Sequence, residues 1–192
     1  MKLRLTGAAL LLAIVTGCAS AVRPGELPLG QWSGSGRVAY EVWKDSDDAK
    51  ADSISRTYAT RMSIQLAQID GHAVTLIEIF SERGTLPVKD WGDQTHLKIA
   101  LVPAKRVSDA MVLYRVVALD FNPKPTDHLH VDEKAQPVSA SCTMLEGDSV
   151  LLIHYGDGAV DSLRFAGNMV EKAGLIASDD GEVHWAERLH QR

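Results

Sequence analysis

From about Leu29 onward, the chain consists of short runs in which hydrophobic and polar residues alternate. In residues 61–66, for example, Met62, Ile64 and Leu66 share one face and their neighbours are polar. A period of two is typical of strands that bury one face. The alternation predicts nine strands, at Gly34–Trp43, Thr57–Ile69, Ala73–Phe80, Thr95–Val102, Met111–Asp120, Val138–Leu145, Val150–Tyr155, Val160–Gly167 and Glu182–Leu189.

Three connections carry the residues of tight hairpin turns, namely Asp70-Gly71, Glu146-Gly147-Asp148 and Gly156-Asp157-Gly158. Strands joined in this way are antiparallel neighbours. A long meander leaves two exposed edges unless it closes. We therefore expect an all-β fold: an antiparallel up-and-down β-barrel, or a strongly curved meander, of about eight to ten strands with at most one short helix.

Two segments depart from simple alternation. Residues Asn168–Ser178 space their apolar side chains at roughly helical intervals, which predicts either one amphipathic helix or a long loop. In Met111–Asp120 both faces are apolar, so something must also cover the outer face of that strand. The residues expected to be buried include Trp32, Leu66, Ile99, Leu113, Val117 and Leu152.

Composition narrows the class of protein. The 192 residues are 45% hydrophobic and 23% charged, which suits one ordinary globular domain. The formal net charge of -5 gives phosphate backbones little to pair with, so nucleic acid is not an expected partner. Of the two cysteines, Cys18 falls in the leader region described next, which leaves Cys142 to pack as a small apolar group.

The first seventeen residues are typical of a secretion signal, because basic residues precede an apolar run too short to span a bilayer. The sequence Val15-Thr16-Gly17-Cys18 that follows resembles the lipobox of bacterial lipoproteins. The resemblance implies a mature chain that begins at a lipidated Cys18 and is held on the membrane by its acyl chains. The alternative is an ordinary secretory signal with a chance cysteine.

In lipoproteins the residue after the cysteine sorts between membranes, and Ala19 is not the aspartate that retains them at the inner membrane. The resemblance therefore implies an outer-membrane lipoprotein that faces the periplasm. The expected organisation is a signal peptide over residues 1–17, a tether over 18–29 and a single barrel domain over 30–192.

The domain opens with Gly30-x-Trp32-x-Gly34-x-Gly36, followed by Tyr40. Gly-x-Trp resembles the first-strand signature of the lipocalin and calycin barrels, in which the tryptophan closes the barrel floor. The extended motif is more similar to the nitrobindin branch, whose small barrels hold haem. Glycines permit sharp bends and close backbone approach in a strand, and an indole supplies a large apolar lid.

The resemblance also implies roles for two residues of the last strand. Lipocalins place a basic residue over the tryptophan, so Arg188 is expected to stack on Trp32 and to share a ligand site or barrel floor with it. His184 would correspond to the haem-ligating histidine of nitrobindins. Its alternation with Val183 and Trp185 instead favours a surface position for His184.

A possible metal site lies in a loop. His128 and His130 are two residues apart and would share one face of an extended segment, with Asp127, Asp132 and Glu133 beside them. No third ligand stands at a recognised spacing, and loops collect polar residues without binding anything. We therefore expect no cofactor.

The remaining candidate motifs are incomplete or absent. The acidic run at residues 45–52 begins like a calcium-binding loop but lacks the glycine at the sixth position and the glutamate at the twelfth. It is expected to be a solvated loop or a lid at the barrel mouth. No motif of a hydrolase, zinc protease, nucleotide-binding or thiol-redox enzyme is present, so the protein is not expected to be an enzyme.

We consider three alternative functions for a barrel on a lipid anchor. The first is a binding module for a small apolar or amphipathic ligand in the barrel mouth. The second is a structural or interaction role with an envelope protein partner, and the third is an enzyme or haem protein. An open apolar interior would favour the first and a filled interior the second. Any cavity is expected to be small, apolar and uncharged, because Met62, Ile64, Leu97, Leu113 and Leu151 are expected to face inward.

Overall fold

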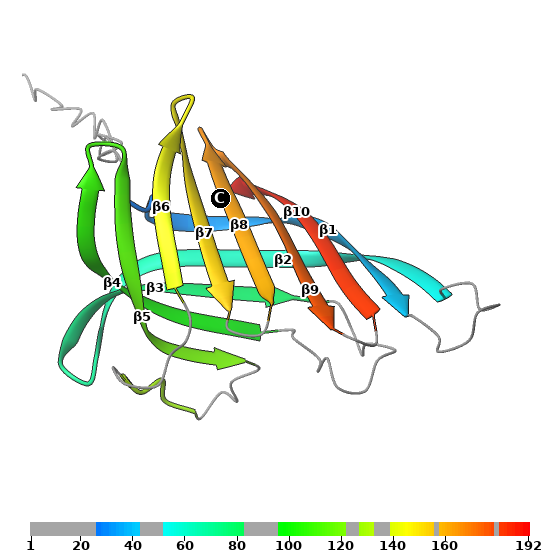
Figure 1. Cartoon of the computed structure of the whole chain (residues 1–192), viewed down its shortest axis with the longest axis horizontal. Coiled ribbons are helices and arrows are strands. Elements are labelled where there is room, and N and C mark those ends of the chain that lie inside the picture. Colours follow the sequence, from blue (N-terminus) through cyan, green and yellow to red (C-terminus); the bar gives the residue numbers. More distant parts are fainter. Residues whose placement is uncertain are drawn as a thin grey trace, which may run out of the picture.

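The computed structural model describes residues 26–42, 52–82, 96–121, 127–132, 139–155, 158–178 and 181–192. These residues form ten antiparallel strands and no helix. Each strand pairs with its neighbours in sequence, and β1 pairs with β10, so the sheet closes into a barrel (Figure 1). The predicted up-and-down barrel is confirmed. Its strands are β1 (Gly30–Val42), β2 (Asp52–Ile69), β3 (His72–Ser81), β4 (His96–Ser108), β5 (Met111–Phe121), β6 (Ser139–Leu145), β7 (Asp148–Tyr155), β8 (Ala159–Ala166), β9 (Met169–Ser178) and β10 (Gly181–Gln191).

Short hairpin turns gather at one end of the barrel, which we call the turn end. Asp70 and Gly71 have φ angles of 49° and 81°, and Glu146 and Gly147 have φ angles of 53° and 92°. Two successive positive φ angles match the right-handed twist of the flanking strands, as the turn residues predicted. Because strand direction alternates, β1 begins and β10 ends at this same end.

The prediction of a helix or loop over Asn168–Ser178 is wrong, because Met169–Ser178 form β9. Ala166 pairs with Met169 across a two-residue turn at Gly167 and Asn168, and Gly167 has a φ of 59°. The alternation was hidden because the inward face of β9 carries Lys172 and Gly174 between its apolar residues. The Gly-Asn pair was the available signal of a hairpin.

The barrel interior holds one continuous apolar core toward the turn end, to which every strand contributes at least one side chain. Such a core is what stabilises a closed sheet, because each inward side chain is removed from water by its neighbours across the barrel. Trp32 and Ile99 are buried in it as predicted, and so is Cys142. Its other members include Met62, Ile64, Ile77, Leu101, Tyr114, Leu151, Ile153, Leu163, Phe165, Val170 and Leu189.

Three residues expected in the core are not buried there. Leu66 has 73% of its surface exposed, because Gly30 pairs with Ile64 and β2 therefore runs past the start of β1. Leu113 and Leu152 are half-buried on the outer face, where the alternation of β5 and β7 places them. Leu97 faces inward but is also only half-buried, near the start of β4.

The outer face of β5 is covered by the segment 127–132 of the same chain, which we call the strap. Leu129 and Val131 of the strap pack against an outer apolar cluster that includes Val117 and Ala118. Ala100 pairs with Ala118 and Leu101 with Val116, so Val117 is a bulge residue and both Val117 and Ala118 face outward. The expected cover over this strand is confirmed.

Along β1 and β10 the outer wall of the barrel is mostly polar. The outward residues of β1 include Gln31, Ser33, Ser35 and Arg37, and those of β10 include His184, Ala186, Arg188 and His190. The described residues include no helix that could cross a membrane.

Candidate functional site

The interior contains a polar network centred on Glu187 of β10, whose side chain is fully buried. Tyr58 donates a hydrogen bond of 2.7 Å to its Oε1 atom, and Thr60 donates one of 3.1 Å to Oε2. Lys172 Nζ lies 3.4 Å from Oε1, and the Ser81 hydroxyl lies 3.5 Å from it. The carboxylate is thus surrounded by donors from β2, β3 and β9.

Lys172 joins this carboxylate to a second one. Its ammonium group lies 3.3 Å from Asp161 Oδ1, and both side chains are almost fully buried. Asp161 also accepts a 2.7 Å hydrogen bond from the Trp185 indole and a 3.1 Å bond from the Tyr155 hydroxyl. The interior is therefore not filled by aliphatic side chains alone: two acidic groups and one basic group meet inside the barrel.

Two glycines make room for the network. A Cβ atom at Gly36 would lie 2.7 Å from Glu187 Cγ and 2.7 Å from the Tyr58 ring. A Cβ atom at Gly174 would overlap the Trp185 ring. Gly36 belongs to the Gly-x-Trp motif at the start of the domain. The absence of a side chain at this position lets Glu187 and Tyr58 pack against the backbone of β1.

The network lies between two apolar clusters, which are the main core and a smaller cluster toward the opposite end of the barrel from the turn end. The smaller cluster consists of Val38, Tyr40, Tyr58, Val183 and Trp185. Removing charges from water is costly unless each has a partner and hydrogen bonds, and here each has both. The geometry fits a structural unit that fixes which side chains meet inside the barrel.

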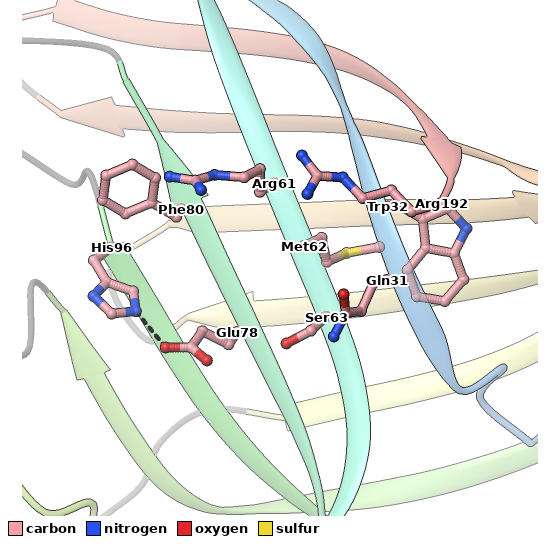
Figure 2. A pocket seen from close by; sticks show the side chains of 9 residues that line it. All are labelled: Gln31, Trp32, Arg61, Met62, Ser63, Glu78, Phe80, His96 and Arg192. Atoms are coloured by element: carbon pink, nitrogen blue, oxygen red, sulfur yellow. Dashed lines mark hydrogen bonds and ion pairs between the residues drawn. The ribbon is translucent and has the colours of Figure 1, made fainter.

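Two hollows stand out among the described residues, and both are open on the outer wall. The first, which we call the outer hollow, has a volume of about 310 Å³. It lies across β1 to β4 at the side where β10 ends (Figure 2). Its lining consists of Gln31, Trp32, Arg61, Met62, Ser63, Glu78, Phe80, His96 and Arg192.

The side chains of the outer hollow form a connected set. The Arg61 guanidinium lies 4.9 Å from the centre of the Phe80 ring, and the His96 ring meets Phe80 edge-on at 5.9 Å. His96 Nε2 lies 2.7 Å from Glu78 Oε1, and Lys98 Nζ lies 3.6 Å from the same oxygen. Glu78 therefore has cationic or donor partners of its own.

Arg192 completes the other side of the outer hollow. Its backbone N–H donates to Gln31 O at 3.0 Å, and its Nε donates to Ser33 Oγ at 2.9 Å. Because Lys98 and His96 already face Glu78, the two guanidinium groups give the hollow a local positive charge on a chain of net charge -5. Two guanidiniums with neutral donors beside them are suited to an oxyanion such as phosphate or carboxylate.

The second hollow, of about 570 Å³, lies over β1, β8, β9 and β10 and differs in its electrostatics. Arg188 donates to Glu171 at 3.0 Å, and Arg164 Nη2 lies 2.6 Å from Asp148. The hydrogen bond to Asp148 raises the pKa of Arg164. Because these arginines are already paired with carboxylates, the second hollow has less positive charge with which to attract an anion.

The structure separates the two residues expected at a common ligand site or barrel floor. Trp32 lies inside, 3% exposed, with its ring 6.0 Å from that of Phe165 in an edge-on contact. Arg188 lies on the outer wall and pairs with Glu171. The predicted stacking of Arg188 on Trp32 is wrong, because alternation along β10 turns Leu189 inward and Arg188 outward.

The histidines singled out from the sequence lie on the outside. His184 is exposed and lies 2.7 Å from Glu182, so it does not point into the barrel. His128 and His130 are exposed on the strap, and His130 Nδ1 lies 3.4 Å from Asp70. Among the described residues, no three histidine, cysteine or acidic side chains form a group that could hold a metal ion. Cys18, Glu133 and the acidic run at 45–52 lie outside the described residues.

Neither the Glu187 network nor the outer hollow was predicted from the sequence. Glu187 stands on the otherwise apolar face of β10, between Trp185 and Leu189, and a charge in such a place was a usable signal of a buried network. The outer hollow had no such signal. Arg61, His96 and Arg192 come from three distant stretches of chain and meet only because β10 closes the barrel beside β1.

The chain matches no known family model. It also matches no curated protein sequence. Among solved structures it is similar to Ail, the attachment invasion locus protein of Yersinia pestis, at 15% sequence identity and a TM-score of 0.27, over 85% of this chain and 97% of that one.

Proposed function

We propose that the chain is a lipid-anchored protein of the bacterial envelope whose barrel works as an interaction module through its outer surface. The observation that carries the proposal is the filled interior. Among the described residues, side chains from all ten strands pack into one core, and the inward positions beyond it hold the Glu187 network and the smaller apolar cluster. This arrangement supports an interaction protein over a carrier of an apolar molecule, which would need an open apolar cavity.

The anchor part of the proposal rests on the sequence and on where the barrel begins. The signal-like residues 1–17 and the lipobox-like cysteine precede β1, which starts at Gly30. The mostly polar outward faces of β1 and β10 suit a domain that stands in the aqueous periplasm while its acyl chains hold it on the outer membrane.

Two measurements test the proposal. Replacement of Cys18 by alanine in the precursor should abolish acyl labelling and membrane attachment together, and persistent labelling would contradict the anchor. The described core and all strand pairs lie within residues 26–192, so a chain that starts at Ala19 keeps the whole barrel. That chain should show no saturable binding of a dansyl fatty acid and no Soret band after addition of haem. Saturable binding with micromolar affinity would instead favour the carrier.

A further inference from the structure

We infer that the barrel rests on the membrane surface through two neighbouring turns, with Val107 and Leu145 at the level of the lipid headgroups. We call these turns, residues 107–110 and 144–148, the tip. The membrane as partner rests on the proposed lipid anchor. Three observations carry the inference: the place where the chain leaves the barrel toward Cys18, the short length of that chain, and the exposed apolar side chains beside it.

The residues before β1 cross the turn end of the barrel. Leu27 is buried in the main core, and its N–H donates a hydrogen bond to the hydroxyl of Tyr114 on β5. Glu26 Oε1 lies 3.8 Å from Arg106 Nη2 on β4. β4 and β5 stand three and four strands away from β1 around the closed sheet. The chain toward Cys18 therefore leaves the barrel beside the β4–β5 hairpin and not beside the start of β1.

The chain between this point and the lipid is short. Seven residues separate Cys18 from Glu26. A fully extended chain over that length spans about 30 Å at most. The part of the barrel beside Arg106 is thus the part that a lipid on Cys18 would hold nearest to the bilayer. A short tether also makes a weak contact effective, because the contact then forms within one anchored molecule.

The β4–β5 and β6–β7 turns form one surface at this place. The Met144 N–H donates a 2.8 Å hydrogen bond to Ala110 O, which joins the two turns. Both hairpins project in the same direction, toward the top of Figure 1. Val107 is 52% exposed near the end of β4, and Leu145 is 58% exposed at the end of β6. Apolar side chains on neighbouring projecting turns are well placed to enter the headgroup region of a bilayer.

The tip has no surplus of positive charge, so apolar contact has to carry the interaction. The exposed residues Lys105 and Arg106 are offset by the exposed residues Asp109 and Glu146, and Arg106 also faces Glu26. Attraction to anionic headgroups needs a cluster of basic residues. Burial of apolar side chains does not depend on the charge of the lipid. We therefore expect the contact on zwitterionic vesicles as well as on anionic ones.

The test uses the full precursor, expressed in bacteria so that Cys18 can be acylated, in a Cys142→Ala background. A nitrobenzoxadiazole label is attached at Val107→Cys or at Leu145→Cys, and the protein is added to preformed phosphatidylcholine vesicles. Both labels should show blue-shifted emission and severalfold weaker quenching by iodide than a label at Ala177→Cys. Ala177 is exposed near the end of β9, at the opposite end of the barrel from the turn end.

A third label site leaves both apolar side chains of the tip in place. Ala110 is exposed between β4 and β5, and a label at Ala110→Cys should be shielded from iodide in the same way. Replacing Val107 and Leu145 together by aspartate should expose this label. Leu66→Asp changes an exposed leucine of β2 and is the matched control, so it should leave the label at Ala110→Cys shielded.

Equal quenching at the tip and at Ala177→Cys in the acylated chain would overturn the inference. Shielding of a label at Leu66→Cys instead of at Val107→Cys would overturn it too, because the membrane would then lie against another corner of the barrel. Shielding only on vesicles that contain phosphatidylglycerol would show that charge carries the contact, against the inference. Acyl labelling is measured on the same samples: its loss contradicts the anchor, whereas loss of shielding in an acylated chain contradicts the contact alone.

Discussion

The Trp185 indole occupies the space that Gly174 leaves empty on the neighbouring strand, and from there it donates a 2.7 Å hydrogen bond to Asp161. The residue pair is set by the register between β10 and β9, in which Trp185 stands directly opposite Gly174. A glycine in the middle of a strand is unfavourable by itself, so its presence here is explained by the ring that lies against it.

Substitution of Gly174 by alanine should therefore destabilise the barrel. The new methyl group would overlap the Trp185 ring and force it to move, at a cost of about 1–3 kcal/mol in the free energy of unfolding. Urea unfolding measures this cost. In a chain that already carries Trp185→Leu, the same substitution should cost much less. Equal costs in the two backgrounds would show that the ring is not the reason for the glycine.

Removal of the central carboxylate should be among the most damaging single changes. Glu187→Ala leaves Lys172 with Asp161 alone and removes the acceptor of Tyr58 and Thr60, so a loss of about 3–5 kcal/mol of stability is expected. Arg188→Gln, on the same strand but on the outer wall, is the control and should cost less than about 1 kcal/mol. Similar losses from the two substitutions, measured by thermal or urea unfolding, would contradict a buried network.

Acid should release the strap from the barrel. The Val131 N–H donates to Asp70 Oδ2 at 2.9 Å, and this hydrogen bond lowers the pKa of Asp70 below its usual 3.8. A lowered folded pKa means that the contribution is complete above pH 3.8 and is lost as the pH falls through the folded value. The protection of the Val131 amide against exchange, relative to an unfolded chain at the same pH, should therefore fall in strong acid. In Asp70→Asn, exchange should already be faster at neutral pH; unchanged exchange would show that the carboxylate does not hold the strap.

The Cys142 thiol should be inert in the folded protein. It is fully buried in the core, and burial raises its pKa to about 11. A disulfide reagent should thus react only as fast as the barrel unfolds. The folded pKa lies above the ordinary value of 9.0, so the thiol ionises more easily in the unfolded chain. The free energy of unfolding should therefore fall by about 1.4 kcal/mol for each unit of pH between pH 9 and pH 11. In Cys142→Ala, this decrease in stability between pH 9 and pH 11 should be absent. Rapid labelling of the native chain by the reagent would contradict a buried thiol.

The fold was largely predictable because strands such as β3 and β7 bury one face and keep a period of two. Prediction failed where an inward position is not apolar. Lys172 and Gly174 made β9 look helical, and both are explained by groups on other strands, Glu187 and Trp185. The place of Leu66 could not be predicted either, since its exposure depends on the pairing of Gly30 with Ile64 and not on its own alternation.

The pairing of β1 with β10 also decides when folding can finish. Trp32 stands opposite Gln191, so contacts that close the barrel join residues from nearly opposite ends of the domain. Such contacts form slowly, because a long loop must be ordered before they are made. A chain still emerging during synthesis or export would hold β1 without one of its two partners until the last strand arrives. Completion of the barrel is therefore a late and all-or-none event, and a chain truncated before Gly181 should accumulate as an open sheet that pairs with other copies of itself.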